Sequence, residues 1–140
     1  HLREQIKKDV VIFMKKLRKN HLEPLIHTFG ADFMSLAERN CVPSKSDTPP
    51  LTLQQAVKYL AEIPEWNLIG AERIERDLSF SNFAQALAFV NIAGEICEQE
   101  NHHANFELGW GRVGIQIWTH DINGLTESDF ILAAKIEEVC

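Results

Sequence analysis

Residues 98–120 read Glu-Gln-Glu-Asn-His-His-Ala-Asn-Phe-Glu-Leu-Gly-Trp-Gly-Arg-Val-Gly-Ile-Gln-Ile-Trp-Thr-His, and this one run contains a helix end, a turn and a strand. Asn101 is suited to close a helix, because Asn tolerates the left-handed backbone of a helix terminus. Residues 113–119 then alternate Val, Ile, Ile and Thr with Gly, Gln and Trp, which predicts a half-buried strand. The stretch therefore places His102 and His103 just past a helix end, and His120 at a strand end.

The segments on either side complete a simple order of helices and strands. Three pairs of polar residues predict helix starts: Thr52 with Gln55, Asn82 with Gln85, and Thr126 with Asp129. Together with the apolar periodicity they predict helices over 53–62, 83–101 and 127–139, and strands over 66–69, 73–80, 106–110 and 113–120. This order, α-β-β-α-β-β-α, predicts an α+β fold: a four-stranded antiparallel sheet with three helices packed on one face. Arg76 falls on the apolar side of its strand, so we expect it to reach the rim or a partner.

The first 45 residues have a different character from the rest of the chain. Apolar residues between 2 and 17 recur at helical spacing, and a second short helix is predicted over about 31–38. Residues 44–50 are rich in Ser and Pro and predict a linker. We therefore divide the chain into a helical N-terminal extension with its linker, 1–45, and a main domain, 46–140. We consider three interpretations of the extension: a transit-peptide remnant, a partner-binding helix, or a packed or oligomer-forming helix. We favour the third.

The charge distribution argues against several classes of protein. Residues 1–30 carry seven Lys and Arg against three Asp and Glu, whereas residues 31–140 carry seven against seventeen. Nucleic-acid affinity depends on basic residues that neutralise phosphates, so the acidic main domain argues against direct nucleic-acid binding. No apolar run approaches the ~20 residues of a membrane span. The three cysteines are few and scattered, which fits a reducing compartment such as the cytoplasm, with Cys97 as a core residue.

The candidate functional residues gather in the opening stretch. Histidine exchanges protons near neutral pH, and three imidazoles with a carboxylate are typical of proton transfer or of a metal site. The residues concerned are His102, His103, His120 and Glu98. Their types alone leave both kinds of chemistry open.

The spacing Glu98-x3-His102-His103-x6-Trp110-x9-His120-x8-Asp129 resembles the signature of the pterin-4a-carbinolamine dehydratases, also called 4a-hydroxytetrahydrobiopterin dehydratases. The resemblance runs from about Pro50 to the C-terminus. Its flanking segments are similar in the same order: Trp66-Asn-Leu, Arg73-Ile-Glu-Arg76, Phe80-Ser-Asn82-Phe83 and Gly124-Leu-Thr-x2-Asp129-Phe. Taken as a set, these matches are specific.

The resemblance implies a reaction, a substrate and a site. The expected reaction is loss of water from 4a-hydroxytetrahydropterin, giving quinonoid dihydropterin in the recycling of tetrahydrobiopterin, by general acid–base catalysis without a metal or other cofactor. The expected partners are the pterin and further copies of the chain in a homodimer or homotetramer. The implied catalytic residues are His102, His103, His120 and Glu98, and the implied substrate-binding residues are Asn101, Thr119, Asp121 and Trp110.

Within that site the roles are expected to differ. By resemblance His103 and His120 transfer protons and His102 contacts the 4a-hydroxyl side, with Glu98 holding an imidazole in one tautomer. Asp129, three residues after Thr126, is interpreted mainly as a helix cap.

Three further residues qualify the resemblance. Trp110 and Trp118 offer flat surfaces against which a pterin ring can stack. Ala104 stands where family members usually have Pro, Cys or Ser, which predicts a less constrained backbone after His103.

Two other functions remain open from the sequence. One is a non-catalytic binding or assembly module, a dimerisation cofactor or scaffold, in which the N-terminal helix contacts the partner. The other is a metal hydrolase that uses the three histidines and Glu98.

Overall fold

The structure, a computed structural model, describes residues 34–140, so the helix predicted over residues 2–17 and the first part of the one predicted over 31–38 lie outside the described residues. The described elements are a 3-10 turn η1 (Leu36–Glu38), α2 (Leu53–Leu60), β1 (Asn67–Ile69), β2 (Arg73–Ser79), α3 (Phe83–Glu100), β3 (Asn105–Gly109), β4 (Arg112–Ile117), a 3-10 turn η2 (His120–Ile122) and α4 (Glu127–Glu137). Three α-helices and four strands follow one another in the predicted order.

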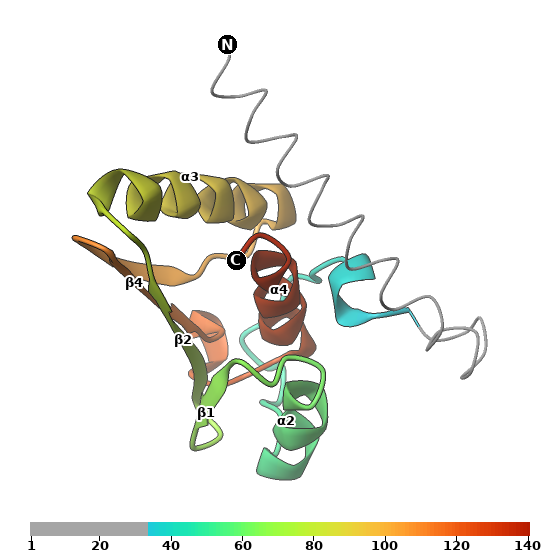
Figure 1. Ribbon diagram of the computed structural model, residues 1–140. Coiled ribbons are helices and arrows are strands. Elements are labelled where there is room, and N and C mark those ends of the chain that lie inside the picture. The colour runs from blue at the N-terminus through green and yellow to red at the C-terminus, as the bar shows by residue number, and fades with distance from the viewer. Residues whose placement is uncertain (1–33) are drawn as a thin grey trace.

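All strand pairs are antiparallel, and the sheet order is β1-β2-β4-β3. Gly70 and Gly111 have positive φ values of 57° and 69°, and each turns the chain between two paired strands. In the central pair Ile74 lies opposite Ile117 and Leu78 opposite Val113. Figure 1 shows α2, α3 and α4 together on one face of this sheet, which confirms the predicted α+β architecture.

Hydrogen bonds and backbone angles confirm the predicted starts of α2 and α3 and the predicted end of α3. Thr52 and Gln55 form a reciprocal capping box at the start of α2. At the start of α3 the Asn82 side chain accepts a hydrogen bond from the Gln85 N–H. Asn101 closes α3 in the left-handed conformation with φ 50°. The chain therefore leaves α3 at a fixed angle directly before His102.

The core lies between the sheet and the helices. It contains alternate residues of the central strands and most of α4, from Phe130 to Ile136. Arg76 lies on the helix side of β2, as its position in the alternation predicts, and its guanidinium pairs with Glu137 of α4 at 3.0 Å. Its charge is thus satisfied at the rim of the core rather than buried unpaired.

Two predicted element ends need correction. The strand expected to run to His120 ends at Ile117, and residues 120–122 form the single turn η2. The reason is a tight reversal: the Thr119 N–H donates to the Gly124 carbonyl at 2.9 Å, and Asn123 adopts a left-handed φ of 48°. The first helix of the main domain stops at Leu60, two residues before the predicted end at 62.

Residues 36–44, which we call the strap, run beside α4 in the opposite direction. Lys135 donates to the Ala37 carbonyl near the end of the helix, whereas Ser128 bonds to Val42 near its start. Leu36 is 1% exposed and belongs to the core. Within residues 34–140 no helix is both long and apolar enough to cross a bilayer.

Candidate active site

Two segments bring the three predicted histidines to one open cavity of about 270 Å³. The first segment directly follows α3, and the second connects β4 to η2. The residues that line the cavity are Pro43, Ser44, Asn101, His102, His103, Trp118, Thr119, His120 and Asp121. The end of α3 and the segment after β4 therefore converge on this cavity.

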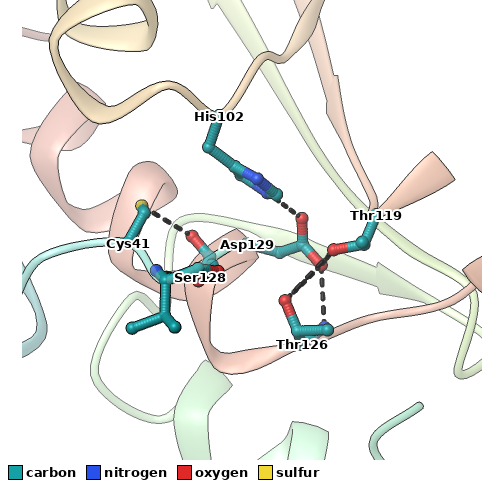
Figure 2. Close-up of polar contacts among 7 residues, drawn as sticks. Cys41, His102, Thr119, Thr126, Ser128 and Asp129 are labelled. Atoms are coloured by element: carbon teal, nitrogen blue, oxygen red, sulfur yellow. Dashed lines mark hydrogen bonds and ion pairs between the residues drawn. The ribbon is translucent and has the colours of Figure 1, made fainter. Parts of the chain in front are cut away.

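His102 is held by Asp129, which lies in the first turn of α4 (Figure 2). The His102 Nε2 atom lies 2.6 Å from Asp129 Oδ1, and the Asp129 side chain is fully buried. The other oxygen, Oδ2, accepts from the Thr119 hydroxyl and from the Thr126 backbone N–H, each at 2.8 Å. The predicted capping role of Asp129 is confirmed, and the same carboxylate also orients an imidazole.

His103 is held by a different carboxylate. Its Nε2 atom lies 2.5 Å from Glu98 Oε2, and both side chains are more than half exposed, at 55% and 77%. The sequence placed Glu98 one helical turn before His102 without deciding which imidazole it serves. The structure pairs it with His103, because the two successive imidazoles contact different elements.

His120 is held by an aromatic contact rather than by a carboxylate. Its ring packs edge-on against Trp118, with the ring centroids 4.3 Å apart. Among residues 34–140 no hydrogen-bond partner contacts its ring nitrogens, and its side chain is exposed at the cavity. The site thus contains two imidazoles paired with carboxylates and one imidazole whose nitrogens both remain open to a ligand.

This arrangement is suited to moving protons. A carboxylate only accepts hydrogen bonds, so His102 and His103 each donate Nε2–H to their partner. In the neutral ring the other nitrogen, Nδ1, is then the basic atom, and the tautomer is fixed by the carboxylate. His120 has no such constraint and can present either nitrogen.

The other predicted site residues divide into two groups. Asn101, Thr119 and Asp121 line the cavity, as does Trp118. Trp110 does not line it: this residue lies at the turn between β3 and β4 and is 74% exposed. A stacking surface for a flat ring is therefore available from Trp118 at this cavity.

Two lining residues, Pro43 and Ser44, were missed by the sequence analysis, which assigned them to the extension and linker. No local signal identifies them, because they reach the cavity only through the packing of the strap on α4.

The sequence left a metal hydrolase open as an alternative. Within residues 34–140 no group of three or more His, Cys, Asp or Glu side chains is arranged to hold a metal ion.

Comparisons with known proteins bear on this cavity directly. The family model described as pterin 4 alpha carbinolamine dehydratase matches residues 49–139. A relative from Rubrobacter xylanophilus, provisionally named a pterin-4-alpha-carbinolamine dehydratase, is 43% identical over 104 residues, which cover 74% of this chain and 97% of the relative. A relative of the same provisional name from Rickettsia canadensis is 47% identical over 103 residues, covering 73% of this chain and 94% of the relative.

A solved structure agrees with these relatives. It is described as a transcriptional coactivator/pterin dehydratase from Brucella melitensis, and it superposes with a TM-score of 0.61 at 29% identity, covering 65% of this chain and 98% of the other. The alignments with the two relatives are longer than residues 49–140, so the similarity begins upstream of Pro49. The chain belongs to the pterin-4-alpha-carbinolamine dehydratase family.

Proposed function

We propose that this protein removes water from a 4a-hydroxytetrahydropterin to give the quinonoid dihydropterin. The observation that carries the proposal is the convergence of His102, His103 and His120 on one cavity, with two of them fixed by carboxylates. The family membership supports the substrate class.

The chemistry needs two proton transfers and no change of oxidation state. One proton reaches the 4a-hydroxyl, the C4a–O bond breaks and water leaves. The N5–H bond gives up its proton, and its electrons form the C4a=N5 double bond. Each positioned acid or base contributes typically about 10²–10⁴-fold to such a step.

The three imidazoles divide these tasks. We assign proton transfer to His103 and His120, and we place His102 at the 4a-hydroxyl side, oriented by the buried Asp129. Asn101, Thr119 and Asp121 supply polar groups for the pterin edge, and Trp118 supplies a wall for the ring.

The proposal is tested by mixing the protein with freshly generated 4a-hydroxytetrahydropterin and following ultraviolet absorbance. We expect His120→Ala to lower kcat by about 10²-fold or more. His27→Ala, which alters a histidine with no place in the family spacing, is the matched control for a histidine substitution. Decay at the uncatalysed rate in the presence of wild-type protein, or full activity of His120→Ala, overturns the assignment.

The wider setting follows from the reaction. The natural role we propose is recycling of tetrahydrobiopterin in the cytoplasm, which is consistent with Cys41, Cys97 and Cys140 forming no disulfide within residues 34–140. We also propose a homodimer or homotetramer, because apolar side chains remain exposed on two helices, Leu53 and Val57 on α2 and Phe83 and Leu87 on α3. Sedimentation velocity of the full chain tests the assembly.

A second function, as a binding or assembly module, is favoured by one observation. The Brucella melitensis structure is described as a coactivator as well as a dehydratase. The same exposed apolar residues of α2 and α3 are the surface that such a role would use. A variant with Leu53→Ser and Val57→Ser that keeps full kcat but loses self-association or a bound partner separates this role from catalysis.

A further inference from the structure

The proposed substrate cavity has a third wall that lies outside residues 49–139, the part of the chain that the family model matches. Two walls come from residues 101–103 and 118–121, within the matched residues 49–139. The third wall consists of Pro43 and Ser44, the last two residues of the strap. Ser44 is half-buried, and no residue of the described chain makes a hydrogen bond with its hydroxyl.

The strap is fastened next to Asp129, the residue that holds His102 (Figure 2). The Ser128 hydroxyl donates to the Val42 carbonyl at 3.0 Å and accepts from the Val42 N–H at 2.9 Å. The Cys41 thiol donates to the Ser128 carbonyl at 3.4 Å. Ser128 directly precedes Asp129, the partner of His102, so the wall and that imidazole share one anchor.

A second fastening ties the strap to the end of α3. The Cys41 N–H donates to Glu100 Oε2 at 3.2 Å. The Lys135 ammonium lies 2.8 Å from Glu100 Oε1 and donates to the Ala37 carbonyl at 2.9 Å. The Lys135 and Glu100 side chains are only 18% and 12% exposed. Glu100 directly precedes Asn101, which lines the cavity, so the strap is joined to both elements that present the site.

A wall held in this way has a defined position relative to the imidazoles. The strap residues before it are secured by a buried side chain, Leu36, and by the ion pair of Arg39 with Glu127 at 2.7 Å. Burial also raises the pKa of the Cys41 thiol to about 12, which agrees with a closely seated chain. Pro43 further restricts the backbone directly before Ser44.

We propose that Pro43 and Ser44 form a substrate-binding wall, in which the Ser44 hydroxyl bonds to a polar group of the pterin and limits which pterins fit. The proposal deepens the proposed function and rests on it. A contact that is equal in ground and transition states raises KM when it is lost and leaves kcat unchanged. The wall is therefore a specificity determinant, and Ser128 is its positioning residue.

The test is steady-state kinetics on the full chain with 4a-hydroxytetrahydropterin. Ser44→Ala is expected to raise KM about threefold to tenfold, the change expected for one lost hydrogen bond, with kcat within about twofold. Ser44→Trp, which fills part of the cavity, is expected to raise KM by about tenfold or more. Ser128→Ala loosens the wall and is expected to raise KM in the same direction. Ser46→Ala, an exposed serine that does not line the cavity, is the matched control and is expected to behave as wild type.

The outcomes distinguish this proposal from the function beneath it. An active wild type whose KM is unchanged in both Ser44→Ala and Ser44→Trp overturns the wall and leaves the dehydratase intact. An inactive wild type refutes the proposed dehydratase activity. In that case the role of the wall is tested by comparing the Kd of 7,8-dihydrobiopterin between wild type and the same variants. Equal Kd values, or no binding to wild type, overturn the wall as well. Ser44→Ala removes only one oxygen, so it decides the matter if Ser44→Trp fails to fold.

Discussion

Asp129 is the residue on which the geometry of the site most depends. Its fully buried carboxylate receives hydrogen bonds from His102, from the Thr119 hydroxyl and from the Thr126 N–H. One side chain therefore starts α4, fixes an imidazole and connects both to the end of β4. A buried donor left without its acceptor costs more free energy than the hydrogen bond had contributed. The three donors therefore all depend on this one carboxylate.

Asp129→Asn is expected to lower both activity and stability. The amide keeps a single acceptor oxygen, so it cannot serve all three donors. We expect kcat to fall about tenfold to a hundredfold, as for other groups that orient a functional imidazole. We expect the free energy of unfolding to fall by about 1–3 kcal/mol. Stopped-flow dehydration and urea unfolding measure the two effects.

Glu98→Gln is the matched control for that substitution. It alters the exposed His103 pair, so the free energy of unfolding should change by about 0.5 kcal/mol or less. If Asp129 were only a helix cap, Asp129→Asn would lower stability and leave kcat at the wild-type value, which would refute its role at the site.

Cys41 offers a prediction about pH that does not depend on catalysis. Burial raises the pKa of its thiol to about 12 from the ordinary 9.0, because a low-dielectric environment disfavours the thiolate. At pH 8 its thiolate fraction, and with it the alkylation rate by iodoacetamide, should be roughly a thousandfold below that of an ordinary thiol. Between pH 9 and 11 the rate should keep rising about tenfold per unit, whereas an ordinary thiol levels off.

Site-resolved mass spectrometry of the alkylated protein measures this profile. The same chain in urea, where Cys41 is exposed, is the reference for an ordinary thiol. Rapid labelling of Cys41 at pH 8 in the folded protein would show that the strap is not seated on α4 as the structure has it.

At the scale of elements, the last turn of α4 is tied to the sheet through Glu137. This carboxylate is 7% exposed and accepts from the Arg76 guanidinium of β2, at 3.0 and 3.2 Å, and from the Trp66 indole N–H beside β1, at 3.1 Å. The first turn of the same helix carries Asp129. Fixing one end of α4 to the sheet therefore helps to fix the carboxylate at the other end.

Glu137→Ala is expected to destabilise the protein by about 2–4 kcal/mol, because it leaves a guanidinium and an indole N–H without their shared acceptor. Urea unfolding measures the change. Asp77→Ala breaks the exposed ion pair with Arg112 at 2.7 Å and should cost about 1 kcal/mol or less. Equal effects of the two substitutions would mean that Glu137 contributes no more than a surface pair.

At the scale of the whole molecule, the predictions that succeeded rest on local chemistry. The capping pair Thr52 and Gln55, the left-handed Asn101 and the alternation in β4 are each decided by a few neighbouring residues, and each is confirmed. The predictions that fell short depend on tertiary packing. Nothing near Asp129 in the sequence shows that it faces His102, and nothing in the spacing of Trp110 shows that it points to solvent.

The predicted domain boundary at residue 46 is the largest question at this scale, and it leads to the last prediction. The strap packs along α4, and Leu36 is 1% exposed in the core, so we expect stability to depend on residues before 46. Leu36→Ala should lower the free energy of unfolding by about 2–4 kcal/mol through the lost contacts and the cavity left behind. Leu108→Ala removes the same atoms from a side chain that is 36% exposed and lies outside the proposed association surface, so it should cost less. A chain of residues 46–140 loses Leu36 together with the strap's hydrogen bonds and ion pairs, so we expect it to be less stable than Leu36→Ala. Wild-type stability of that shorter chain in urea would instead establish residue 46 as the true start of the domain, with the strap as an accessory to it.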